Sequence, residues 1–205
     1  MEAMAMKGRY GMAAALLALV GLVLGGCAVS PQQVEVRPSL PLDADTWGRS
    51  LPVAVQVEDR REETVLGSRG GIYGESSTVT VSNDLGLAVG RAVNAYLATQ
   101  GFQTNAAGEG ATRLRIAVEE LTYEAPDTRL GQETRLTAAL RAEARRDGQA
   151  VNGRYQAEAV HRSVNRPGAE TNQRWINQVL SDVLRRMLDD PRLREFLRQE
   201  AGVEH

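Results

Sequence analysis

The chain contains one cysteine, two histidines and few aromatic residues, and each scarcity limits its chemistry. Because Cys27 is the only thiol, no disulfide can form within one molecule. Zinc sites are built mainly from clustered cysteine and histidine side chains, and the sequence has no such cluster. We therefore expect no metal site and no cofactor, and a fold that is stabilised by its own apolar core.

Lysine is almost absent, since Lys7 is the only one in the 205 residues. Arginine supplies the remaining positive charge, and the net charge of the chain is −2. A nucleic-acid footprint needs a clustered basic surface, so this balance argues against a nucleic-acid partner. The length fits one domain with a leader and a tether.

A single long apolar run covers residues 12–24, and the cationic residues Lys7 and Arg9 precede it. The run is shorter than the roughly 20 residues that a membrane-spanning helix needs. A cationic start, an apolar core and small residues before the cleavage site are typical of a secretion signal. We therefore predict a signal peptide over residues 1–26, and an uncleaved anchor helix is the alternative.

The apolar run ends in Leu24, Gly25, Gly26 and Cys27. This pattern resembles the lipobox of bacterial lipoproteins, which implies cleavage before Cys27 and acylation of its thiol and its new amino group. Two or more acyl chains, such as palmitate, hold a protein stably on a membrane. Ala28 stands where lipoproteins retained in the inner membrane carry Asp. The resemblance therefore implies the periplasmic face of the outer membrane of a Gram-negative bacterium.

Residues 27–50 are predicted to form the lipidated cysteine and an extended tether. Pro31, Pro38 and Pro41 lie among polar residues without helical periodicity. A Pro-rich linker extends by about 3.1 Å per residue, so the tether would lift the domain away from the membrane. An edge strand over residues 34–37 is the alternative, and periodicity does not decide between the two. The periplasmic domain is predicted over residues 51–205.

Hydrophobic periodicity predicts the elements of this domain. Alternation predicts strands over 53–58, 78–82, 113–123, 136–144 and 155–159, and apolar stripes predict helices over 85–97, 172–188 and 191–197. The order β-β-α-β-β-β-α-α favours an α+β fold. We expect a two-layer sandwich, in which a mostly antiparallel sheet carries the helices on one face.

Local signals accompany this order. The tight-turn signal Asp147-Gly148 makes the last three strands an antiparallel meander. A phase slip at Glu119-Glu120 predicts a β-bulge. Gly101 is predicted to end the first helix, and Thr171 to cap the second. Asp190-Pro191 is predicted to start the last helix, with Asp as N-cap and Pro at its first position.

Once this order is assembled, the chain resembles the YajG family of uncharacterised bacterial lipoproteins. The matching pieces are the lipobox, residues 34–38 and 55–61, the helix that ends at Gly101-Phe102, and residues 179–197. The family has no established activity, so the resemblance implies a location and a fold rather than a reaction. The layout is also similar to small periplasmic lipoproteins that dock onto envelope enzymes or assembly machines, which is an analogy of fold.

No catalytic set stands out. Of the two histidines, His205 lies at the chain end, and the phase of His161 predicts a packed or half-exposed residue on a strand face. Adjacent strand residues such as Glu119 and Glu120 point to opposite faces, which disfavours paired-carboxylate catalysis. Asp189-Asp190 are interpreted as helix-end residues and Arg145-Arg146 as a solvated face. We therefore predict that the protein is not an enzyme.

The glycine-rich stretch over residues 67–74 is predicted to be a loop. Successive glycines can form an anion-binding nest, but the Lys of a phosphate-binding loop is lacking. If the loop has a role, we expect Arg69, Ile72 and Tyr73 to contact a partner.

The leading functional hypothesis is a non-enzymatic envelope accessory or scaffold that binds a periplasmic protein or a cell-wall polymer such as peptidoglycan. The alternative is a binder of small ligands or glycans that works through a groove beside the glycine-rich loop. A hydrolase is a third hypothesis, which would require His161 within reach of a serine and an acid.

Overall fold

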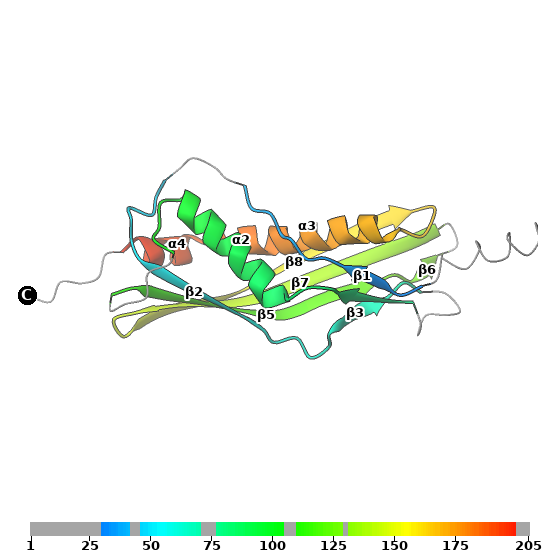
Figure 1. Ribbon diagram of the computed structural model, residues 1–205, viewed down its shortest axis with the longest axis horizontal. Coiled ribbons are helices and arrows are strands. Elements are labelled where there is room, and N and C mark those ends of the chain that lie inside the picture. The colour runs from blue at the N-terminus through cyan, green and yellow to red at the C-terminus, as the bar shows by residue number, and fades with distance from the viewer. Residues whose placement is uncertain (1–29, 42–45, 71–76, 105–109, 129–130, 200–205) are drawn as a thin grey trace, which may run out of the picture.

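The computed structural model describes residues 30–41, 46–70, 77–104, 110–128 and 131–199, and the statements below concern these residues. Their order is β1 Gln32–Val34, β2 Val53–Asp59, β3 Val65–Ser68, β4 Thr78–Val81, α2 Leu85–Thr99, β5 Thr112–Glu124, β6 Asp127–Thr128, β7 Gly131–Arg146, β8 Gln149–Ser163, α3 Ala169–Leu188 and α4 Pro191–Arg198. The helices lie on one face of the sheet, as Figure 1 shows, and the predicted α+β class is confirmed.

The eight strands form one mixed sheet. Strands β5, β7 and β8 form two long antiparallel ladders, in which β7 lies between β5 and β8 and β8 is an edge strand, and this confirms the predicted meander. Strand β2 runs parallel to the first half of β5, and β3 runs parallel to the end of β5. The sequence analysis missed β3 and β6, which have four and two residues, and it offered an edge strand next to β1 only as an alternative, over residues 34–37.

The core lies between the sheet and the helices. On β7, alternate residues are buried and several are alanine, including Ala138, Ala142 and Ala144. These small side chains let α3 approach the sheet closely. Leu180 and Leu184 of α3, both fully buried, fill the space between the helix and the sheet. Each buried Leu contributes roughly 1.5–3 kcal/mol relative to an exposed one. A sheet with one such apolar face leaves its other face to solvent.

Two turn signals are confirmed by backbone geometry. Asp147 and Gly148 join β7 to β8 with φ values of 48° and 77°, which suits a two-residue hairpin turn. Gly101 follows α2 with a φ of 87°, a conformation that glycine adopts without a Cβ clash.

The predictions for helix starts have mixed outcomes. Asp190 caps α4 through a hydrogen bond from the Arg192 amide, and Pro191 takes the first position, as predicted. The cap predicted at Thr171 is wrong. Helix α3 begins at Ala169, with Gly168 as its N-cap and no side-chain cap, so Thr171 lies inside the first turn.

Within the predicted tether, residues 27–50, the described residues 30–41 favour the alternative of a packed strand, so the folded part includes residues before 51. The N-terminal segment, residues 30–41, is part of the fold. It contains β1, which runs parallel to β4, and it buries Val34 and Val36 completely. Prolines disfavour a central strand but are tolerated where the chain runs along an edge, which is why their presence here misled the prediction.

Candidate functional site

The face of the sheet opposite the helices is covered by charged side chains rather than by another layer. On β7 the even-numbered residues are buried under the helices, so the odd-numbered residues point to the other face. We call this surface the uncovered face. Its charged residues on β5, β7 and β8 include Arg113, Arg115, Glu119, Arg135, Arg141, Glu143, Arg145, Arg154, Glu158 and Arg162.

The centre of the uncovered face is organised around Glu119. The ladder between β5 and β7 shifts register between Val118 and Glu120, which confirms the predicted bulge. Glu119 accepts hydrogen bonds from Arg141 at 2.7 Å and from Arg154 at 2.8 Å. The Arg141 hydrogen bond, with a further one from Arg154, holds the pKa of Glu119 below its ordinary value. Glu119 is therefore a fixed anion within an arginine cluster, rather than half of a carboxylate pair.

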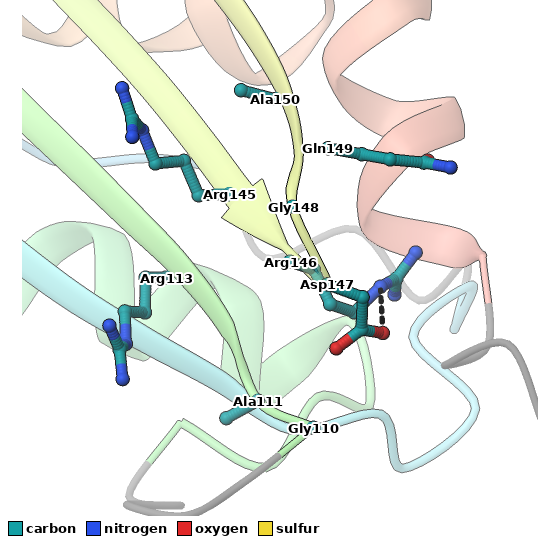
Figure 2. Close-up of a pocket in the computed structure, with 9 residues that line it drawn as sticks. All are labelled: Gly110, Ala111, Arg113, Arg145, Arg146, Asp147, Gly148, Gln149 and Ala150. Atoms are coloured by element: carbon teal, nitrogen blue, oxygen red, sulfur yellow. Dashed lines mark ion pairs between the residues drawn. The ribbon is translucent and has the colours of Figure 1, made fainter.

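A cavity of about 580 Å³ lies at the end of the sheet where β7 turns into β8, which we call the hairpin end. Its lining includes Gly110, Arg113, Arg145, Arg146, Gly148 and Gln149. Figure 2 shows the side chains of Arg113 and Arg145 on one side of the hairpin and that of Arg146 on the other. The cavity therefore opens beside a pair of arginines on the uncovered face.

Arg113 and Arg145 are direct cross-strand partners in the β5–β7 ladder. Like charges at such a position destabilise a sheet unless they are compensated. Arg145 has one counter-charge, since it forms an ion pair with Glu143 at 2.6 Å and lowers the pKa of that carboxyl. Within the described part of the chain, Arg113 has no hydrogen bond or ion pair. The positive charges of Arg113 and Arg145 are thus only partly compensated, by the one carboxylate of Glu143.

Arg146 forms the rigid side of the same hairpin. The expectation that it belongs to a solvated face is wrong, because Arg146 is only 9% exposed. It donates hydrogen bonds to Thr112 and to the carbonyls of Phe196 and Gln199, and its guanidinium stacks on the Phe196 ring. These contacts satisfy carbonyls at the end of α4 and tie the hairpin to that helix.

The opposite end of the sheet, which we call the N-terminal end, contains a buried arginine. Arg69 is 5% exposed and donates to the carbonyl of Ser30 at 3.1 Å and to that of Pro167 at 3.2 Å. Burial lowers the pKa of its guanidinium. The partner contact predicted through Arg69 remains a prediction, and the burial of this side chain, which follows β3 directly, argues against it. Ile72 and Tyr73 lie outside the described residues.

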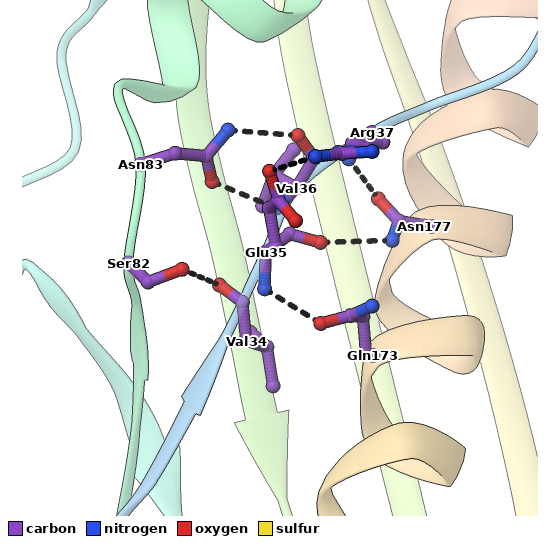
Figure 3. A network of polar contacts seen from close by, with 8 residues as sticks. All are labelled: Val34, Glu35, Val36, Arg37, Ser82, Asn83, Gln173 and Asn177. Atoms are coloured by element: carbon purple, nitrogen blue, oxygen red, sulfur yellow. Dashed lines mark hydrogen bonds and ion pairs between the residues drawn. The ribbon is translucent and has the colours of Figure 1, made fainter.

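The N-terminal segment is held through its backbone by polar side chains on both sides (Figure 3). On one side, the Asn83 amide accepts from the Val36 amide and donates to the Val36 carbonyl, at 2.8 and 2.9 Å. On the other, residues of α3 bind the amides of residues 35, 37 and 39 through Gln173, Asn177 and Ser181. These hydrogen bonds are to the main chain of the segment, and they add to the burial of its side chains Val34 and Val36 in the core.

Comparison with known proteins identifies the family. A family model described as "Uncharacterized lipoprotein" matches residues 38–198. The chain belongs to the YajG family of uncharacterized lipoproteins. Lipoprotein YajG of Escherichia coli K12 is 26% identical over 194 residues, covering 91% of this chain and 97% of the relative. The same values hold for YajG of Escherichia coli O6:H1 strain CFT073.

A solved structure supports the fold of this YajG-family chain. Protein XCC0632 from Xanthomonas campestris superposes with a TM-score of 0.54, at 12% identity, covering 82% of this chain and 97% of that chain. At this identity the likeness concerns the fold alone. The family description indicates a membrane-anchored envelope protein. In the described ranges, no helix of this YajG-family chain is long and apolar enough to span a membrane.

The candidate catalytic residues of this YajG-family member have structural roles. His161 stacks on Trp175 with ring centroids 4.1 Å apart, which confirms the predicted strand-face packing, and burial lowers its pKa. Asp190 accepts from the Tyr155 hydroxyl at 2.8 Å, and Asp189 pairs with Arg194 at 2.5 Å. Among the described residues, no group of three or more acidic, histidine or cysteine side chains is placed to hold a metal.

A second hollow, of about 420 Å³, lies between α2 and β2. Gly86 and Gly90 face Val57 there, and Leu87 is 60% exposed. The groove expected beside the glycine-rich loop concerns residues 71–76, which lie outside the described ranges. The hairpin-end arginines were missed by the sequence analysis, because their meeting depends on the β5–β7 register, which the bulge shifts.

Proposed function

We propose that the chain is a non-enzymatic lipoprotein of the outer membrane, anchored through acylated Cys27, whose uncovered face binds a periplasmic partner. The observation that carries this proposal is the uncovered face itself. Three long strands present a continuous charged surface, while the helices occupy the other side of the sheet. A rigid sheet surface with many positioned polar groups suits binding of a protein or a cell-wall polymer better than chemistry.

The location of the chain termini supports the anchoring part of the proposal. Ser30, the first described residue, follows Cys27 closely and is held at the N-terminal end by Arg69. Strand β7 has 16 residues, which corresponds to roughly 50 Å of extended chain. An anchor at Cys27 would therefore hold one end of the molecule at the membrane and allow the hairpin end to project into the periplasm.

A small-ligand or glycan binder is the weaker candidate. Such sites are usually concave and mostly apolar, with a few convergent polar groups. The hairpin-end cavity is instead bordered by arginine and glycine at a strand turn. A hydrolase is weaker still, because His161 makes no hydrogen bond to a serine or an acid in the described part of the chain.

Photo-cross-linking in intact cells tests the docking surface. A photoreactive residue in place of Gln156, which points outward from β8, should capture a reproducible neighbour. The matched control is the same substitution at Gln178, an exposed position of α3 on the opposite side of the molecule. Equal capture from both positions, or capture from neither, would contradict docking through the uncovered face.

Membrane fractionation tests the anchor. Cys27→Ser removes the acylated thiol and should shift the protein out of the outer-membrane fraction, because lipid chains are its proposed attachment. Circular dichroism of the purified variant should match that of the wild type, since the described fold begins after Cys27. A Cys27→Ser protein that still sediments with the outer membrane would refute the anchoring mechanism.

A further inference from the structure

Uncompensated positive charge is concentrated at the hairpin end of the uncovered face. Arg113 and Arg145 stand directly opposite each other, and Arg115 follows on the same face of β5. Glu143 lies across from Arg115 but is bound by Arg145 at 2.6 Å. Among the described residues, Glu143 is therefore the single carboxylate beside the three arginines, and its ion pair is with Arg145. Toward the N-terminal end of the same face the balance is reversed, because the single arginine Arg135 forms ion pairs with three carboxylates, those of Glu124, Glu133 and Glu158.

The backbone that carries these arginines is fixed in place. The two-residue turn at Asp147-Gly148 sets the register of β7 and β8. Arg146, between Arg145 and that turn, is buried against Phe196 and the end of α4. A ligand would therefore meet guanidinium groups mounted on a rigid hairpin. Such preorganisation reduces the entropy lost on binding.

The spacing of the arginines specifies the ligand. Direct cross-strand partners have Cβ atoms roughly 5 Å apart, so one carboxylate can contact both Arg113 and Arg145. Arg115 lies two strand residues beyond Arg113, at roughly 6.7 Å. An extended peptide repeats its side chains on one face at the same interval. Acidic residues at alternate positions of such a peptide would match the arginines in register.

We propose that Arg113, Arg115 and Arg145 form a binding site for an extended acidic segment of a periplasmic protein partner, with carboxylates at alternate positions. Arginine forms bidentate, charge-assisted hydrogen bonds to carboxylates, which give both affinity and orientation. The headgroups of the anchoring membrane do not fit this site, because the length of β7 separates it from the N-terminal end by roughly 50 Å. The inference rests on the proposed docking function and names its recognition element.

Peptide binding to the purified acylated protein in detergent tests the site. The probe is a fluorescent synthetic peptide in which glutamate alternates with threonine, and the same peptide with glutamine in place of glutamate is the neutral control. Arg113→Gln with Arg145→Gln should weaken binding of the acidic peptide about tenfold or more, because two charge-assisted contacts are lost. Binding should also weaken as salt is raised.

The matched control variant is Arg135→Gln with Arg162→Gln, which removes the same charge from the N-terminal end of the uncovered face. Its affinity should stay within about twofold of the wild type, since screened charges at this distance act weakly. Equal losses in both variants would overturn the proposal and indicate non-specific charge attraction. Stronger binding to phosphatidylglycerol vesicles than to the peptide would also overturn it, in favour of a lipid surface.

The two proposals fail in distinguishable ways. If Gln156 captures a partner and the folded Arg113→Gln, Arg145→Gln protein captures it equally well, the arginine site is refuted and docking on the uncovered face stands. If the wild type captures no neighbour from Gln156, docking through the uncovered face is refuted, whatever the peptide does in solution. Loss of capture only in the hairpin-end variant supports both proposals.

Discussion

The two ends of the sheet use arginine in opposite ways. At the N-terminal end, Arg69 is buried and its hydrogen bonds to two carbonyls join segments far apart in the sequence. At the hairpin end, Arg113 and Arg145 lie on the surface, and of the two only Arg145 has an ion pair among the described residues, with Glu143. A buried guanidinium with saturated contacts stabilises a fold, whereas an exposed and under-compensated one is available to a ligand. The contrast supports a structural role for Arg69 and the proposed recognition role for the arginines at the hairpin end.

Replacing an arginine at each end gives the largest expected difference. Arg69→Ala should lower the free energy of unfolding by about 2–4 kcal/mol, because it leaves the buried carbonyl of Pro167 and the part-buried carbonyl of Ser30 without this donor. Arg145→Ala should change it far less, since the ion pair of Arg145 with Glu143 is exposed and screened by solvent. Urea denaturation of both variants measures the difference. Similar losses would show that the two ends do not differ in the way described.

Loss of the Asn83 contacts should have the next largest effect. Asn83→Ala removes both hydrogen bonds to the backbone of Val36 and should cost about 1–3 kcal/mol. The matched control is Asn152→Ala, on the exposed part of β8, which should change stability by about 0.5 kcal/mol or less. Hydrogen exchange at the Val36 amide should accelerate in the first variant alone. An unchanged exchange rate would contradict the role of Asn83 in holding the segment.

The smallest effect concerns Glu119, which lies between the two ends. Its pKa is depressed in the folded protein, so its ion pairs stabilise the fold at pH values above the ordinary 4.5. This stability is lost as the pH falls below 4.5 and through the depressed value. Glu119→Gln should therefore lower the free energy of unfolding by about 1 kcal/mol or less at neutral pH. It should also weaken the dependence of that free energy on pH in the acid range, which urea denaturation at several pH values measures. A Glu119→Gln protein with the wild-type pH dependence in that range would refute the assignment.

Elements with a long and regular pattern could be predicted from the sequence. The meander of β5, β7 and β8 followed from alternation and from Asp147-Gly148, and the bulge followed from the phase slip at Glu119-Glu120. The N-terminal strand could not be predicted in this way. The prolines around it suggested a linker, its pairing partner is β4, and the residues that follow it are held by Asn83 and by α3, far along the chain.

The arginine site was beyond sequence reasoning for a related reason. Arg113 and Arg145 are separated by a bulge and by the turn region between β5 and β7, so their alignment depends on a register that periodicity does not give. Arg69 illustrates the converse, because a charged residue in a glycine-rich stretch suggests exposure. Its burial depends on Ser30 and Pro167, which come from distant parts of the chain.

The hydrogen bonds between α3 and the N-terminal segment have a consequence for the order in which the molecule folds. The hydrogen bonds from Gln173 and Ser181 join residues that are 138 and 142 positions apart. Synthesis begins at the N-terminus, so the amides of residues 35 and 39 must wait until α3 has been made before they find these partners. Contacts of such long range close late and slowly. The chain therefore stays incompletely folded until it is nearly finished, a state compatible with threading through a narrow translocation channel.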